Sequence, residues 1–164
     1  MRYAAYGSNL HPLRLQQRLA SMKLLGTQRL GTRSLAFHKR GRDGSGKCSI
    51  SVGSDSLFVA VYEIDPDGLA RLDRIEGVGT GYDRIVVDVP GYGACHSYRA
   101  SPSYVDESLK PFDWYRELVL LGCRYHGFPP DYTDRIRRAD TMEDPDRNRR
   151  SEQWRLAAML EAAL

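Results

Sequence analysis

The chain has 164 residues, a formal net charge of +3 and an ordinary globular balance of apolar and charged residues. It is long enough to bury one substantial core, and no apolar run reaches the length of a membrane span. No long apolar stretch follows Arg2, so no signal peptide is apparent. Three cysteines without paired spacing indicate free thiols in a reducing cytoplasm, rather than a disulfide scaffold or a zinc site.

A short apolar run at residues 3–6 predicts the first strand, and the pentapeptide Tyr6-Gly7-Ser8-Asn9-Leu10 follows from its end. Helical spacing begins just beyond the pentapeptide. A glycine-bearing turn between a strand and a helix start points several backbone N–H groups at one place, where they bind a carboxylate or a developing oxyanion. The pentapeptide therefore predicts a cradle for a small anion.

The helix expected after this cradle carries Leu15, Leu19 and Met22 on one face. Pro12 suits its first turn, where the missing N–H group is not needed. We expect Asn9 to cap this helix, because a short amide side chain accepts a hydrogen bond from the free N–H groups of a first turn.

Basic side chains gather between residues 29 and 47, where only Asp43 opposes them. A solvated, mobile surface is the favoured interpretation, with the glycine- and serine-rich residues 41–53 as a flexible loop. A nucleic-acid patch is the alternative, although Phe37 is the one aromatic residue in that stretch that offers stacking. The basic residues are Arg29, Arg33, Lys39, Arg40, Arg42 and Lys47.

The middle of the chain predicts several strands around one short helix. Asp65 and Pro66 have the chemistry of a helix start, and Gly77 that of a helix end. Residues 57–64 form a near-continuous β-prone run, as in a buried central strand. Apolar and polar residues alternate along residues 82–89, which are predicted to pair with residues 94–100 as a hairpin around a turn at residues 90–93. The predicted strands cover residues 57–64, 82–89 and 94–100.

Helices are expected to close the chain, at residues 112–126, just after Pro130 and near residues 154–164. This order predicts a single α+β domain, with a curved, mixed or antiparallel, β-barrel-like sheet flanked by helices. We assign residues 1–140 to the domain and residues 141–164 to a C-terminal extension. The extension is expected to pack on the domain or on a partner subunit, so a homodimer is possible.

Glu76 is out of place on its predicted helix. It follows Leu72 by four residues and Leu69 by seven, which puts its carboxylate on the apolar face. A carboxylate there is costly to ionise unless it is paired or has a chemical role, such as that of a general base. The alternatives are an ion pair with Arg74, Arg84 or Arg99, or a side chain that turns to solvent.

Several motifs in this order resemble the γ-glutamylcyclotransferase family. The specific combination is the pentapeptide at residues 6–10, the Glu-Gly-Val segment at residues 76–78 and the Gly-x-Pro-x-x-Tyr segment at residues 127–132. The resemblance covers roughly residues 1–140 and weakens between Met22 and Phe58. Further matches are Cys95-His96-Ser97-Tyr98, Tyr115, Leu121-Gly122 and Gly127-Phe128-Pro129-Pro130-Asp131-Tyr132.

The resemblance implies an enzyme that closes the α-amine of a γ-glutamyl compound on its own γ-carbonyl group, releasing 5-oxoproline and an amine. Glu76 would match the family's catalytic glutamate. Residues 6–10 (Tyr6, Gly7, Ser8, Asn9 and Leu10) would bind the substrate, and Tyr98 and Tyr115 would line the pocket. No cofactor or metal is implied, and the four histidines lack metal-ligand spacing.

Two other classes of function stay open at this point. The first is a non-catalytic module of the same fold that binds a small carboxylate. The second is a nucleic-acid-associated protein that uses residues 29–47. Ser8 is not expected to be a nucleophile, since it lacks the Gly-x-Ser-x-Gly turn. The sequence leaves open which amine is released: an α-amino acid, a lysine side chain or part of a specialised metabolite such as an aminoglycoside. A glutathione-directed relative is a further option, although the signature loop of such enzymes usually differs from residues 6–10.

Overall fold

The computed structural model describes residues 1–164, apart from the side chain of Ser54. Five strands form one sheet in the order β2-β3-β1-β5-β4. β1 and β5 are parallel, and all the other neighbours are antiparallel. The predicted α+β class with a mixed sheet is therefore confirmed. The strands are β1 (Arg2–Ala5), β2 (Met22–Arg40), β3 (Gly46–Ile64), β4 (Tyr82–Val89) and β5 (Gly93–Ala100).

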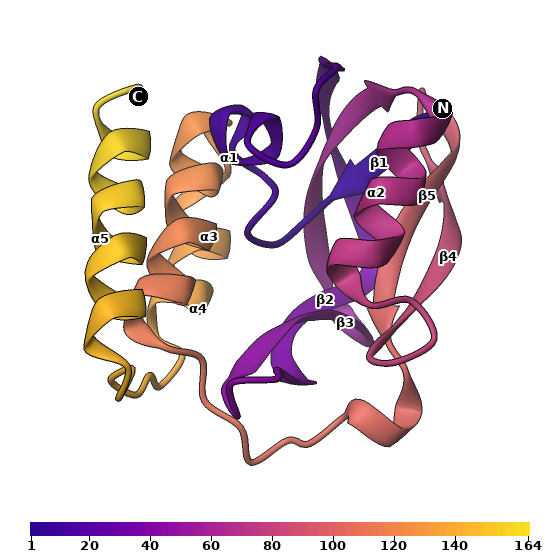
Figure 1. The fold of residues 1–164 in the computed structure, drawn as a ribbon. Coiled ribbons are helices and arrows are strands. Elements are labelled where there is room, and N and C mark those ends of the chain that lie inside the picture. The colour runs from indigo at the N-terminus through magenta and orange to yellow at the C-terminus, as the bar shows by residue number, and fades with distance from the viewer.

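Helices lie on both sides of the segment that follows β1 (Figure 1). α2 packs near the sheet, whereas α3, α4 and α5 form a separate group, and α1 lies between the two. None of the described helices combines the length and apolar character of a membrane span. The helices are α1 (Pro12–Gln16), α2 (Pro66–Glu76), α3 (Asp113–Tyr125), α4 (Pro130–Arg137) and α5 (Arg147–Glu161), with a 3-10 turn at Pro102–Tyr104.

Local sequence signals placed α2 and the β4–β5 hairpin correctly. The Asp65 carboxylate accepts a hydrogen bond from Gly68 N at 2.6 Å, which caps the first turn of α2. Gly77 ends the helix with a left-handed φ of 71°, a conformation that a residue without Cβ adopts without strain. In β4, Val87 and Val89 are buried while Val86 is exposed, as the alternation predicted.

The prediction of a flexible loop at residues 41–53 is wrong. β2 and β3 form a long antiparallel hairpin whose connection is only residues 41–45. Cys48 and Ile50 are buried in the core, so apolar burial and cross-strand hydrogen bonds hold this segment despite its glycine and serine content.

The expected helix after the pentapeptide is shorter than predicted. α1 ends at Gln16, and Met22 already begins β2. Asn9 does not cap α1; the cap is His11, whose Nδ1 accepts a hydrogen bond from Leu13 N at 3.2 Å. The amide of Asn9 is thereby left for another contact.

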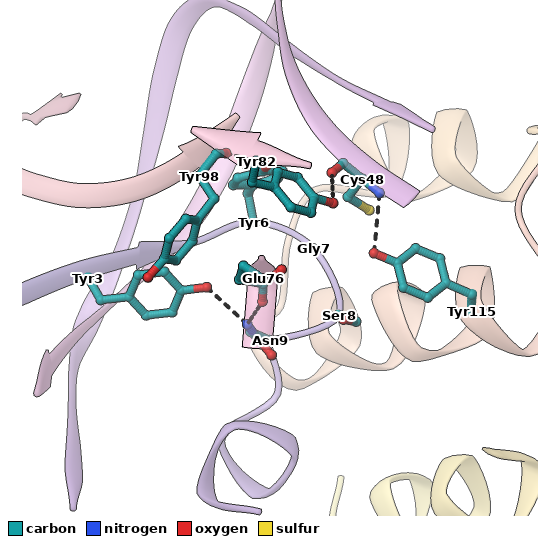
Figure 2. Close-up of a pocket in the computed structure, with 10 residues that line it drawn as sticks. All are labelled: Tyr3, Tyr6, Gly7, Ser8, Asn9, Cys48, Glu76, Tyr82, Tyr98 and Tyr115. Atoms are coloured by element: carbon teal, nitrogen blue, oxygen red, sulfur yellow. Dashed lines mark hydrogen bonds between the residues drawn. The ribbon is translucent and has the colours of Figure 1, made fainter. Parts of the chain in front are cut away.

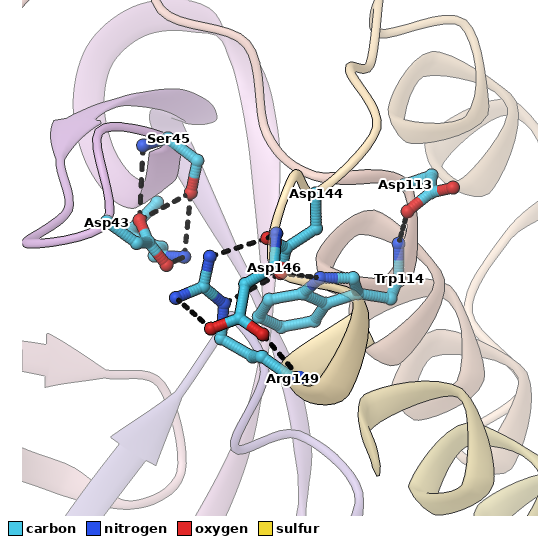
Figure 3. A network of polar contacts seen from close by, with 8 residues as sticks. Asp43, Ser45, Asp113, Trp114, Asp144, Asp146 and Arg149 are labelled. Carbon is cyan, nitrogen blue, oxygen red and sulfur yellow. Dashed lines mark hydrogen bonds and ion pairs between the residues drawn. The ribbon is translucent and has the colours of Figure 1, made fainter. Parts of the chain in front are cut away.

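The C-terminal extension packs on α3. Ala157 and Leu160 of α5 are buried, whereas Trp154 and Met159 of the same helix are exposed. Asp144, just before α5, is 1% exposed and accepts hydrogen bonds from the Trp114 indole and the Arg149 guanidinium (Figure 3). The bonds from Arg149 are the main cause that lowers the pKa of Asp144 to about 2.

Gly122 of α3 lets the helix lie directly against the pentapeptide. A Cβ at this position would overlap Leu10 Cβ and lie 3.1 Å from His11 N. Leu10 is fully buried, and its carbonyl oxygen accepts a hydrogen bond from Tyr62 Oη at 2.5 Å. The end of the pentapeptide is therefore fixed from two sides.

We predict that Gly122→Ala lowers the free energy of unfolding by about 1–3 kcal/mol, because the added methyl group overpacks this contact. Urea unfolding followed by circular dichroism measures the change. Gly31→Ala is the matched control, since a Cβ there meets nothing within 4 Å and the backbone is not left-handed. Its stability should stay within about 0.5 kcal/mol of the parent chain. Equal losses in the two variants would contradict the proposed contact.

Candidate active site

The pentapeptide, the end of α2 and the sheet enclose a small pocket (Figure 2). Its empty volume is about 300 Å³. Tyrosines supply half of its lining residues, and one carboxylate lies beside the pentapeptide. The lining residues are Tyr3, Tyr6, Gly7, Ser8, Asn9, Cys48, Glu76, Tyr82, Tyr98 and Tyr115.

The pentapeptide passes close to β3 at Gly7. A Cβ on Gly7 would lie 2.9 Å from Cys48 Cβ, so only glycine fits this path without a shift. A hydrogen bond of 3.0 Å from Leu10 N to Gly7 O closes the turn. Among the described residues, the N–H groups of Gly7, Ser8 and Asn9 have no hydrogen-bond acceptor. The turn thus presents free donors at the pocket, as a cradle for a small anion requires.

Glu76 is the last residue of α2, and its side chain is 17% exposed. Its Oε1 atom accepts hydrogen bonds from Arg18 at 3.1 Å and from Asn9 Nδ2 at 3.2 Å. Asn9 Nδ2 also donates to Tyr3 Oη at 3.0 Å, which fixes the orientation of the amide. Oε2 has no partner within the described part of the chain, so one carboxylate oxygen is held and the other is available.

Two structural alternatives were open for Glu76: an ion pair with a nearby arginine and a side chain that turns to solvent. It does form an ion pair, but with Arg18 rather than with Arg74, Arg84 or Arg99. Arg84 instead pairs with Asp73 at 2.7 Å, one turn earlier on α2. The carboxylate lies at the pocket and does not turn away to solvent.

The hydroxyl groups of the lining tyrosines are engaged with the protein. Tyr98 Oη donates to Asp73 Oδ1 at 2.9 Å, and Tyr6 Oη donates to the Tyr98 carbonyl oxygen at 2.5 Å. Tyr115 Oη accepts from Cys48 N at 3.2 Å. Burial raises the pKa of each of these phenols, so they stay neutral. They shape the wall of the pocket.

The structure brings most of the predicted site residues together. Tyr6, Gly7, Ser8 and Asn9 line the pocket with the predicted glutamate and the two later tyrosines. Leu10 does not line it, because its side chain is buried against α3. Its carbonyl oxygen instead anchors the turn, so this residue supports the site from behind.

Sequence reasoning missed four residues of the site. Tyr3, Cys48 and Tyr82 come from strands, where their pattern indicated only structural positions. Arg18 lies just beyond α1 and reaches Glu76 across 58 residues of sequence. No local spacing signals such a contact, since it depends on how α1 and α2 meet at the pentapeptide.

A wider cleft continues from the pocket past Glu76 and Tyr115, which line both cavities. From the basic stretch at residues 29–47, only Lys39, Arg42 and Lys47 line this cleft. Arg29, Arg33 and Arg40 do not line it, so the stretch does not form one basic surface. The further basic residues of the cleft are Arg14 and Arg18.

Lys47 is held firmly at the edge of the cleft. Its Nζ atom lies 2.8 Å from Asp43 Oδ2 and 4.7 Å from the centre of the Tyr115 ring. Asp43 also accepts hydrogen bonds from Ser45, beside the Asp144 and Arg149 pair (Figure 3). The C-terminal extension therefore lies beside one wall residue of the cleft, Asp43, but contributes no lining residue itself.

No group of three potential metal ligands exists among the described residues. The cysteines are all buried and free. Burial raises the pKa of the Cys48 thiol to about 12, and also raises those of Cys95 and Cys123. A thiol in this state is a poor nucleophile, because the thiolate is the reactive form.

We predict that the native protein resists alkylation by iodoacetamide at pH 8. Only about one Cys48 thiol in ten thousand is ionised four units below its pKa, and access is blocked as well. Intact-mass spectrometry should detect no adduct on the folded chain and three adducts after unfolding in guanidinium. Rapid native labelling at Cys48 would refute the buried, neutral thiol.

Comparison with known proteins agrees with this fold. Residues 56–136 match the sequence profile of the AIG2-like family. The chain is 28% identical over 145 residues to a γ-glutamylcyclotransferase of Bos taurus, an alignment that covers 82% of this chain and 76% of that protein. It is also 28% identical over 146 residues to the γ-glutamylcyclotransferase of Homo sapiens, with coverage of 82% and 76%.

A solved γ-glutamyl cyclotransferase structure superimposes with a TM-score of 0.84 at 23% identity, covering 97% of this chain and 98% of that one. At this identity the likeness establishes the fold. The chain is therefore similar to γ-glutamylcyclotransferases in sequence and in fold, and the predicted resemblance to that family is confirmed.

Proposed function

We propose that this protein is a γ-glutamylcyclotransferase that acts on a small γ-glutamyl compound and releases 5-oxoproline and an amine. One observation carries the proposal: a carboxylate with one free oxygen and a turn with unpartnered N–H groups line the same small pocket. This pairing supplies a base and an oxyanion site within reach of one ligand.

The reaction needs no external nucleophile. The α-amine of the γ-glutamyl group attacks its own γ-carbonyl carbon, and the bond from that carbon to the leaving nitrogen breaks. A five-membered lactam, 5-oxoproline, results. Glu76 Oε2 takes one proton from the α-ammonium group before the attack and gives it to the leaving nitrogen as the carbon–nitrogen bond breaks. The ring nitrogen then loses its second proton through the same carboxylate to the released amine, so a neutral lactam and an ammonium product form and the carboxylate is regenerated. Holding the glutamyl chain folded places amine and carbonyl together, which contributes several kcal/mol.

The pentapeptide stabilises the charge that develops on the carbonyl oxygen. Its free N–H groups are fixed before the substrate arrives, because Gly7 packs on β3 and Leu10 packs on α3. A preorganised donor of this kind is worth about 3 kcal/mol of transition-state stabilisation. Arg18 and Asn9 hold Glu76 through Oε1 and leave Oε2 for proton transfer.

The decisive experiment measures 5-oxoproline released from a panel of γ-glutamyl compounds. The panel includes γ-glutamyl α-amino acids, γ-glutamyl-ε-lysine and a γ-glutamyl aminoglycoside. Release from any of them supports the cyclotransferase. A folded protein that releases none, but binds members of the panel by calorimetry, would instead be a non-catalytic carboxylate-binding module.

We predict that Glu76→Gln lowers kcat by about 10²–10⁴-fold while the fold is kept, because the amide cannot accept the proton. Glu63→Gln is the matched control: Glu63 is exposed on β3 and does not line the pocket, so kcat should not change. Stopped assays of 5-oxoproline with both purified variants provide the measurement. Near-parental activity in Glu76→Gln would remove Glu76 as the base.

We further propose that the enzyme acts in the cytoplasm, where reducing conditions keep its three buried thiols free. A role in binding nucleic acid is not favoured, since the basic stretch is divided between the cleft and the outer surface. If the protein is retained on DNA or RNA at low salt and released as the salt concentration is raised, nucleic-acid binding would be supported after all.

A further inference from the structure

The cleft beside the pocket contains more positive charge than the protein itself neutralises. Five basic side chains line it, against the two carboxylates of Asp43 and Glu76. Each carboxylate already has one partner, since Asp43 pairs with Lys47 and Glu76 with Arg18. The remaining three, Arg14, Lys39 and Arg42, form no ion pair within the described part of the chain.

Two of these three cations are withdrawn from water. Lys39 is 7% exposed, and its Nζ atom contacts aromatic rings instead of carboxylates, 4.7 Å from the Tyr82 ring centre. Arg14 has a buried Nε atom without a hydrogen-bond acceptor. Burial is the main cause that lowers the pKa of both groups, to about 10 for Arg14. Burying an unpaired cation is costly, so a buried cation normally has an anionic partner.

The third cation, Arg42, lies close to the end of α2. Arg42 is exposed, and its guanidinium lies near Gly77, the residue that follows Glu76. The cations therefore come from α1, from β2 and from the turn between β2 and β3, all around one cavity whose empty volume is about 890 Å³. They surround the space into which a group bound at Glu76 would extend.

The two cavities divide the substrate between them. The smaller pocket, with the pentapeptide and the tyrosines, suits the γ-glutamyl group, whose reacting carbonyl must lie at the N–H groups. The leaving amine then lies beyond Glu76, in the cleft. A γ-glutamyl group carries one carboxylate, and its ammonium group is met by Glu76. One carboxylate does not balance three cations.

We infer that the amine released by this enzyme carries at least two negative charges, which Arg14, Lys39 and Arg42 neutralise in the cleft. This inference rests on the proposed function for the identity of the γ-glutamyl part. Carboxylates and phosphate groups both meet the requirement, because each accepts charge-assisted hydrogen bonds from arginine and lysine. An acidic amino acid and a phosphorylated amine are the two sources to be distinguished.

Two pairs of substrates isolate the charge. The first pair is γ-glutamyl-glutamate against γ-glutamyl-glutamine, which differ by one negative charge at equal size. The second pair is γ-glutamyl-O-phosphoserine against γ-glutamyl-serine. We expect kcat/KM to favour the more anionic member by about tenfold or more, the effect of one charge-assisted hydrogen bond in a partly buried site. Because the phosphate adds nearly two negative charges and the carboxylate one, the pair with the larger effect per added charge identifies the source.

Variants assign the preference to the cleft. Lys39→Met and Arg42→Gln should each reduce the ratio toward one, mainly through KM for the anionic member. Arg42 is exposed, so its variant should fold even where Lys39→Met does not. Arg33→Gln is the control. It removes one positive charge from β2, the strand of Lys39, but Arg33 does not line the cleft, so the ratio should stay unchanged.

Equal kcat/KM values within both pairs would overturn the inference, as would a preference that survives in Lys39→Met and Arg42→Gln alike. If no compound yields 5-oxoproline, the proposed function fails, and calorimetric binding of the same pairs tests the cleft separately. Tighter binding of the anionic members, reduced in Arg42→Gln but not in Arg33→Gln, would support it. Equal binding would refute it.

Discussion

The close packing of the pentapeptide between β3 and α3 is the constraint on which the candidate active site depends. Two glycines make it possible. Gly7 lies where a Cβ would collide with Cys48, and Gly122 lies where a Cβ would collide with Leu10. Since the turn is held from both sides, its N–H groups keep their direction without partners of their own. A site for a developing negative charge needs such fixed donors.

Charge is distributed around this turn in two tiers. Close to it, Arg18 and Asn9 hold one oxygen of Glu76, so the base is oriented by groups from a different part of the chain. Farther out, the cleft places buried cations without carboxylate partners among the described residues. The inner tier suits proton transfer on a γ-glutamyl group, and the outer tier suits recognition of what that group is attached to.

The sequence predicted features that depend on neighbouring residues, but it did not predict contacts between distant segments. The cap at Asp65, the end of α2 at Gly77 and the β4–β5 hairpin follow from residues next to one another, and they were predicted correctly. The expected loop at residues 41–53 failed because residues 46–53, despite their glycines and serines, lie in a strand that pairs with β2. The expected cap at Asn9 failed because its amide contacts Tyr3 and Glu76 instead.

By itself, the sequence determined the class of fold, the pentapeptide turn and the carboxylate on the wrong face of α2. Each of these is a matter of residue type and spacing along one element. Only the tertiary structure decided that Arg18 is the partner of Glu76, that Leu10 supports the turn from the core, and which basic residues face the cleft. The reason is physical: neighbours along a strand point to opposite faces, so Lys39 lines the cleft while Arg40 pairs with Asp106 outside it. Which face becomes the wall of a cavity is set by the elements packed against it.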